Sequence, residues 1–98
     1  CKVTFKLKFA LEQNHPNPFN PSTKIAYSIP SDSHVELMVY DVAGRLVRTL
    51  VDEPRRANRY TAVWDGKDDR GTQAASGVYF YRIQAGKYRA TKKMVLLK

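Results

Sequence analysis

Apolar and polar residues alternate along most of this chain with a period of two. Such alternation is the pattern of a β-strand that buries one face and exposes the other. The clearest apolar faces consist of Ile25, Tyr27, Ile29, Val35, Leu37, Val39, Tyr60, Ala62 and Trp64. The sequence therefore predicts strands over residues 24–29, 34–40 and 60–64.

Four other segments predict strands of different character. Lysines alternate with apolar residues over 2–9, which predicts a half-buried strand whose lysines face water. The pattern over 45–51 is irregular and favours a bulged or twisted edge strand. Residues 78–83 are apolar on both faces and predict a central strand. Alternation over 88–97 completes the set, with Val95 and Leu97 on one face and Met94 and Leu96 on the other.

Three segments between these strands carry turn or loop signals. Residues 41–44 fit a type I turn, since Asp suits its first position and Gly the left-handed position at its end. Residues 52–58 are charged and contain Pro54, so we expect a loop there. Residues 85–87 predict a short hairpin connection.

About seven short strands at regular spacing, without a helical segment, are the layout of an antiparallel sandwich. We therefore expect an all-β, immunoglobulin-like fold. The chain has one cysteine, Cys1, which cannot form an internal disulfide and lacks the partners of a zinc site. Packing alone must then hold the sheets together, and we place Tyr27, Trp64 and Tyr79 at the centre of the core.

Length and charge narrow the class of protein. The 98 residues, 43% of them apolar, suit one domain too small for a deep catalytic cleft. The net charge is +8, and residues 70–98 contain seven Lys or Arg and no Asp or Glu. The resulting positive electrostatic potential favours anionic partners in general. The basic residues are scattered and match no nucleic-acid-binding motif, so we do not expect nucleic acid.

No residue pattern supports catalysis. The chain has two histidines, His15 and His34, and the segment 31–34 (Ser-Asp-Ser-His) is too short for its side chains to converge on one reacting atom. A turn and the start of a strand explain it better. Since nucleotide and hydrolase motifs are also absent from the sequence, we expect no enzyme and no cofactor.

Two weaker alternatives concern ligands. The acidic loop Asp65–Asp69 could hold calcium, but it includes Lys67, and we favour carboxylates that bond the loop's own amides. Trp64, Tyr79, Tyr81 and Tyr88 could form a sugar-stacking platform. Alternating aromatics in strands more often lie in cores, so we favour burial.

Residues 15–21 (His-Pro-Asn-Pro-Phe-Asn-Pro) form a stiff, shaped loop, because each proline fixes its own φ and restricts the preceding residue. Phe19 is the one large apolar side chain in this loop. We expect it to insert into the adjoining domain, and the alternative is display to a partner.

Five ordered motifs give the chain a family resemblance. They are Asn14-His15-Pro16-Asn17-Pro18-Phe19-Asn20-Pro21, Val39-Tyr40-Asp41-Val42-Ala43-Gly44-Arg45, Val63-Trp64-Asp65-Gly66, Ser76-Gly77-Val78-Tyr79-Phe80-Tyr81-Arg82 and Lys92-Lys93-Met94-Val95-Leu96-Leu97-Lys98. Together they resemble a type A C-terminal sorting domain of the type IX secretion system. His15 departs from the family, which often has Tyr there.

The resemblance implies that the domain directs an attached cargo in the same chain through the outer-membrane translocon of Bacteroidetes and related bacteria. It implies removal by a sortase-like peptidase, and a cargo that is released or held at the cell surface on anionic lipopolysaccharide. The recognition residues that it implies are Pro16, Asn17, Pro18, Phe19, Asn20, Gly44, Arg45, Lys93, Met94, Val95, Leu96, Leu97 and Lys98.

The same resemblance sets the expected domain limits. Residues 9–98 would form the sorting domain, and 1–8 a linker, the end of the upstream cargo or an added edge strand. Because residue 1 is Cys, we expect the sequence to be a piece of a longer chain, with any export signal upstream. The alternative families are the immunoglobulin-like domain of the flagellar hook-capping protein, a structural assembly module, and a carbohydrate-binding module of a secreted hydrolase.

Overall fold

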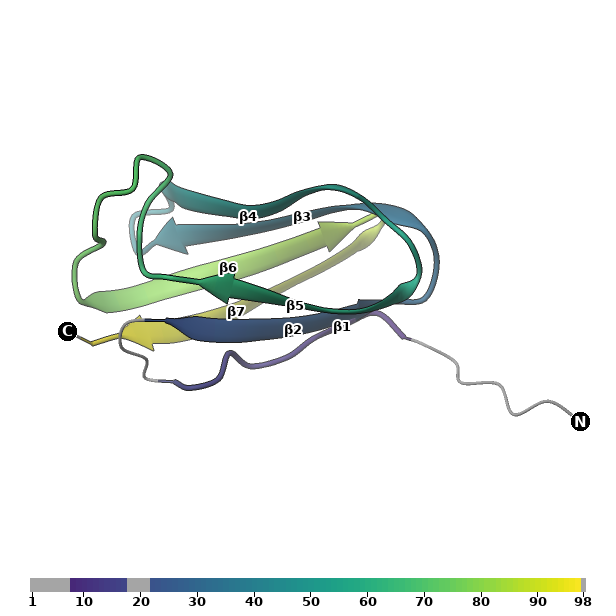
Figure 1. Ribbon diagram of the computed structural model, residues 1–98, viewed down its shortest axis with the longest axis horizontal. Coiled ribbons are helices and arrows are strands. Elements are labelled where there is room, and N and C mark those ends of the chain that lie inside the picture. The colour runs from purple at the N-terminus through teal and green to yellow at the C-terminus, as the bar shows by residue number, and fades with distance from the viewer. Residues whose placement is uncertain (1–7, 18–21, 98) are drawn as a thin grey trace, which may run out of the picture.

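A computed structural model describes residues 8–17 and 22–97 and shows two antiparallel sheets packed face to face (Figure 1). The strands are β1 (Ala10–Leu11), β2 (Thr23–Ile29), β3 (Ser33–Asp41), β4 (Leu46–Arg55), β5 (Asn58–Trp64), β6 (Gly77–Ala85) and β7 (Tyr88–Leu96). One sheet has the order β1-β2-β5 and the other β4-β3-β6-β7. The predicted all-β, immunoglobulin-like sandwich is confirmed. Within the described ranges, no helix is long and apolar enough to cross a bilayer.

The apolar faces predicted from the alternation point into the sandwich. The inward side chains of β2 and β3 are fully or almost fully buried, and β6 lies between β3 and β7 as predicted for a central strand. Pairing of β3 with β4 shifts register between Leu37 and Met38 and again between Val39 and Tyr40. These irregularities confirm the bulged edge strand predicted for 45–51.

Two predicted boundaries are wrong. Residues 52–55 continue β4 rather than forming a loop, and Pro54 lies opposite His34. Half of the N–H groups of an edge strand face away from its one neighbour, so a proline there need not remove a ladder bond. At the other end of the chain, Phe9 precedes the first strand instead of ending one, and its ring stacks on Tyr88 at a centroid distance of 4.8 Å. The rest of the predicted 2–9 strand, residues 2–7, lies outside the described residues.

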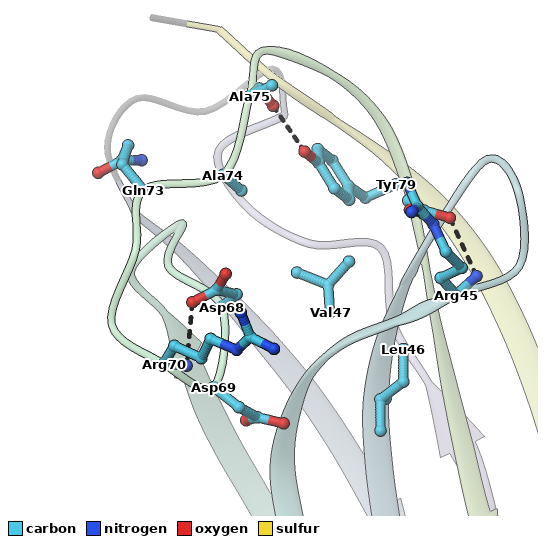
Figure 2. A pocket seen from close by; sticks show the side chains of 11 residues that line it. Arg45, Leu46, Val47, Asp68, Asp69, Arg70, Gln73, Ala74, Ala75 and Tyr79 are labelled. Atoms are coloured by element: carbon cyan, nitrogen blue, oxygen red, sulfur yellow. Dashed lines mark hydrogen bonds and ion pairs between the residues drawn. The ribbon is translucent and has the colours of Figure 1, made fainter.

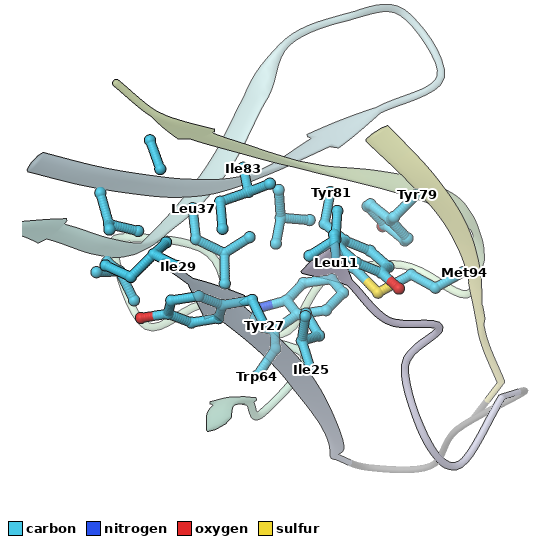
Figure 3. Close-up of a cluster of buried hydrophobic side chains, with 14 of the residues drawn as sticks. Leu11, Ile25, Tyr27, Ile29, Leu37, Trp64, Tyr79, Tyr81, Ile83 and Met94 are labelled. Atoms are coloured by element: carbon cyan, nitrogen blue, oxygen red, sulfur yellow. The ribbon is translucent and has the colours of Figure 1, made fainter. Parts of the chain in front are cut away.

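Trp64 is completely buried between the sheets (Figure 3). Its indole and the ring of Tyr79 form a T-shaped pair at a centroid distance of 5.3 Å and an angle of 70°, and its Nε1 donates to the Lys67 carbonyl at 2.8 Å. Tyr27 and Tyr79 are also buried, so all three predicted core aromatics are confirmed. Tyr81 is buried with them, which contradicts a flat, exposed sugar platform on these side chains.

We predict that Trp64→Ala lowers the free energy of unfolding by about 3–5 kcal/mol, because it removes a large side chain from the contact between the sheets. Urea unfolding followed by circular dichroism measures the loss. Val63→Ala is the matched control: the neighbouring side chain is 56% exposed, so its truncation should change stability by less than about 0.5 kcal/mol. Equal losses in the two variants would contradict a core centred on Trp64.

Candidate functional site

Three of the motifs, residues 14–21, 39–45 and 92–98, contain the predicted recognition residues, and their described parts gather at one end of the sandwich (Figure 1). Figure 1 shows the start of β2, the 41–45 turn, the 65–76 loop and the end of β7 on the left. The strand register also brings the 41–45 turn and the end of β7 to the same end of the sheet, since Asp41 lies opposite Tyr79, and Tyr79 lies opposite Met94. We call this the distal end. Pro18, Phe19, Asn20 and Lys98 lie outside the described residues, and with them the prediction for the Phe19 side chain.

A buried hydroxyl anchors the segment that leads to the distal end. Tyr81 of β6 donates from its Oη to the Glu12 carbonyl at 2.7 Å and accepts the Asn14 N–H at 2.8 Å. Burial raises the pKa of the Tyr81 phenol to about 12, so the hydroxyl keeps its proton throughout the physiological range. One side chain thus satisfies two backbone groups across the edge of the sandwich.

The Asn14 side chain extends this buried polar network. Its Nδ2 donates to the Pro16 carbonyl at 3.1 Å and to Thr23 Oγ1 at 3.0 Å, and Thr23 in turn donates to Pro16 at 2.9 Å. Asn14 and Thr23 are almost fully buried. The backbone of His15 adds two hydrogen bonds with Lys24, each of 2.9 Å. The chain before Pro18 therefore has a fixed course along β2.

The same segment is tied to β7. Gln13 Nε2 donates to the Lys93 carbonyl at 2.7 Å, and Asn17 Oδ1 accepts the Val95 N–H at 3.0 Å. These bonds use backbone groups on the free edge of β7, which is the last strand of its sheet. The proline-rich motif and the final motif, far apart in the sequence, are therefore parts of one surface.

Only part of the final motif is available to a partner. Met94 and Leu96 are fully buried in the core, whereas Lys93 is exposed and Leu97 is 50% exposed. Val95 is half-buried. Met94 and Leu96 thus support the surface from inside, and among the described residues of this motif Lys93 and Leu97 are the ones most open to contact.

The 41–45 turn presents Arg45 in a fixed geometry. Gly44 has a φ of 83° and donates its N–H to the Asp41 carbonyl at 3.0 Å, as predicted for this turn. Asp41 Oδ1 accepts the N–H groups of Ala43 and Arg45, and its Oδ2 lies 3.0 Å from Arg45 Nε. These bonds, led by the one from the Arg45 backbone, lower the pKa of the Asp41 carboxyl below its ordinary value of 3.8.

Beside this turn lies an open hollow of about 600 Å³ (Figure 2). Val47 and Tyr79 supply apolar surface at its base, and Arg45 borders it on one side. Asp68, Asp69 and Arg70 come from the 65–76 loop opposite. Charges of both signs around apolar surface suit the binding of a peptide or protein surface.

The carboxylates of this loop bond backbone amides, as predicted in preference to calcium ligation. Asp65 accepts the Lys67 N–H at 3.0 Å, and Asp68 accepts those of Arg70 and Thr72 at 2.9 Å each. Asp69 instead accepts the Thr49 N–H of β4 at 3.1 Å. The loop is therefore held by its own side chains and by β4.

The side chains of residues 31–34 make separate contacts with different parts of the chain. Asp32 accepts the Ala57 N–H at 2.8 Å, Ser33 donates to the Ser31 carbonyl, and His34 contacts Asp52. The Asp32 and Ser33 contacts are those expected of a turn and the start of a strand, whereas the His34 contact crosses from β3 to β4.

Sequence reasoning missed Gln13, Thr23 and Tyr81 as residues that build the distal end, and used Asn14 only within a motif. The one available signal was Thr23, a polar residue that directly precedes the predicted strand 24–29 and is in phase with its buried face. The partners themselves are 67 residues apart for Asn14 and Tyr81, and 80 for Gln13 and Lys93. Alternation along a strand carries no information about such pairs.

The two packed antiparallel sheets define an immunoglobulin-like β-sandwich domain. The model of the FlgD Ig-like domain family matches residues 17–88. The chain therefore belongs to the FlgD Ig-like domain family. No curated protein matches it in sequence.

PorU, PorZ and FlgD are among the solved structures that resemble this domain. Dimeric latent PorU from Porphyromonas gingivalis matches with a TM-score of 0.71 and 23% identity, over 93% of this chain and 9% of PorU. PorZ, described as an essential bacterial surface component of the type-IX secretion system of Porphyromonas gingivalis, matches with a TM-score of 0.60 and 17% identity, over 88% of this chain and 11% of PorZ. FlgD from P. aeruginosa matches with a TM-score of 0.60 and 27% identity, over 76% of this chain and 58% of FlgD. This chain thus spans less than two thirds of each of these proteins, and the likeness to PorU and PorZ concerns the fold alone.

We predict that Tyr81→Phe frees the segment before the proline-rich motif. The variant leaves the Glu12 carbonyl and the Asn14 N–H without this partner, at a cost of about 1–3 kcal/mol. Amide hydrogen exchange at Asn14 should become faster. Tyr79→Phe is the control, since it removes a bond to Ala75 and should leave Asn14 unchanged. Unaltered exchange at Asn14 in Tyr81→Phe would show that the hydroxyl does not hold the segment.

We predict that Asp41→Asn reduces stability at neutral pH and not in acid. A carboxyl with a lowered pKa stabilises the fold above its ordinary value of 3.8, and this contribution is lost as the pH falls through the folded-state pKa. Denaturant unfolding at neutral pH and well below 3.8 measures the difference. Glu12→Gln, at an exposed side chain, is the control. A deficit of Asp41→Asn that persists undiminished in acid would contradict the role of the charge.

Proposed function

We propose that this domain is a type A C-terminal sorting domain that directs its cargo through the type IX outer-membrane translocon. The observation that carries the proposal is the 3.0 Å bond between Asn17 and Val95, because it joins the proline-rich motif to the final motif in one surface. Both motifs belong to the sequence resemblance, and a rigid surface loses little entropy when a receptor docks. The fold shared with PorZ, a type IX component, adds support.

The proposed partners are the translocon, a sortase-like peptidase and the cargo in the same chain, with export to the cell surface or medium. In this proposal the domain itself is not an enzyme. Contact with anionic lipopolysaccharide is supported by charge: the net charge is +8, and the residues after Arg70 include no carboxylate side chain.

A structural assembly module is the second candidate. The family match over residues 17–88 and the 27% identity to FlgD favour it as much as the motifs favour sorting. The two candidates differ in what they require of the distal end. A sorting signal must be read there during export, whereas an assembly module gives an attached reporter no route across the outer membrane.

The test is export of a fluorescent protein fused ahead of residues 9–98 in a host with a working type IX system. Deleting residues 93–98 would remove the buried Met94 and Leu96 and so confound recognition with unfolding. The sharper variant is Lys93→Glu with Leu97→Ser, which changes exposed positions only. The control is Arg89→Glu with Val63→Ser: Arg89 undergoes the same change of charge near the other end of β7, and Val63 is an exposed apolar residue of β5.

We expect the Lys93/Leu97 variant to lower export by about tenfold or more, the effect of losing about 1.4 kcal/mol of receptor binding. The Arg89/Val63 control should export like the parent. Retention of the folded parent fusion in the periplasm would contradict the sorting proposal for that host and favour the assembly module. Equal export of all three fusions would show that this face of β7 is not read.

A further inference from the structure

Three potential metal ligands meet on the outer face of the four-stranded sheet, on β3 and β4. His34 Nε2 lies 2.7 Å from Asp52 Oδ1, and Glu36 is the direct cross-strand partner of Asp52. One ligand atom from each of the three residues lies within 4.8 Å of the others. His34 and Glu36 are two residues apart on β3, so their side chains point to the same face.

The charge at this cluster is poorly balanced for so basic a chain. Two carboxylates directly opposite each other on neighbouring strands repel. In residues 8–17 and 22–97, no lysine or arginine forms an ion pair with Glu36 or Asp52, and His34 is the one basic side chain that contacts Asp52. The arginines of the described ion pairs contact other carboxylates.

The donor set identifies the class of cation that suits this geometry. An imidazole nitrogen with two carboxylate oxygens fits a divalent transition ion such as Zn²⁺, whereas Ca²⁺ and Mg²⁺ take oxygen ligands. The loop Asp65–Asp69 offers no imidazole, and its carboxylates already accept backbone N–H groups. The β3–β4 cluster is thus better suited to such an ion than the loop that the acidic sequence suggested.

We propose that His34, Glu36 and Asp52 form a surface binding site for one divalent transition-metal ion, with water completing the coordination. The site is independent of the proposed sorting function and lies away from the distal end. A bound ion links β3 to the edge strand β4 near Pro54, so it stabilises the folded chain in proportion to its occupancy.

The test is calorimetric titration of the full 98-residue chain with Zn²⁺ alone, in a Cys1→Ser background because a cysteine thiolate also binds zinc. His34→Ala and Glu36→Gln each remove one ligand at a surface position. His15→Ala is the matched control, since His15 is the other histidine of the chain and is exposed. Thermal unfolding with and without Zn²⁺ provides the second measurement.

We expect one ion per chain in the parent and in His15→Ala, with a rise of the unfolding midpoint in Zn²⁺. Each ligand variant should bind about tenfold more weakly or worse, and its midpoint should respond less to Zn²⁺. Matching midpoints without metal verify that the variants fold. Absence of binding by the parent overturns the proposal, as does parent-like binding by His34→Ala. Parent-like binding by Glu36→Gln overturns the three-residue site.

Discussion

The contact between the inner faces of the two sheets holds the domain together, and Trp64 lies at its centre. Because the chain has a single cysteine, this packing has no internal disulfide to assist it. The same aromatic core also positions the distal end. Trp64 bonds the Lys67 carbonyl, and Tyr79 bonds the Ala75 carbonyl at 2.6 Å, so two core side chains hold the two ends of the loop that borders the hollow.

A second constraint is that buried polar groups need partners. Tyr81 satisfies the backbone of the segment before the proline-rich motif, and Asn14 and Thr23 satisfy each other and Pro16. This requirement explains why polar side chains occur in an otherwise apolar interior. It also keeps the segment close to β7, where Asn17 reaches Val95.

Alternation predicted most strands correctly because burial of one face leaves a direct trace in the sequence. The prediction failed for residues 52–55 of β4. Their charges and Pro54 indicated a loop, although an edge strand tolerates proline. Alternation favoured burial of Tyr81, which is correct, but it could not give the role of the hydroxyl, since its partners Glu12 and Asn14 lie far away in the sequence.

The candidate site was predictable only through its motifs. The resemblance named Asn17 and Val95, and nothing in their spacing indicated that they bond to each other. The motif also included Met94 and Leu96, which alternation correctly placed on the opposite face from Val95 and Leu97. The Asp69 bond to Thr49, which helps position the hollow, joins residues that no local pattern relates.

The bonds from Gln13 to Lys93 and from Asn17 to Val95 have a consequence for folding. They join residues 80 and 78 positions apart in the sequence, so this surface is complete only when the early segment and β7 have come together. Closing such long loops costs entropy before the contacts stabilise the fold. A receptor that binds this surface would therefore bind fully folded molecules in preference to truncated or partly folded ones.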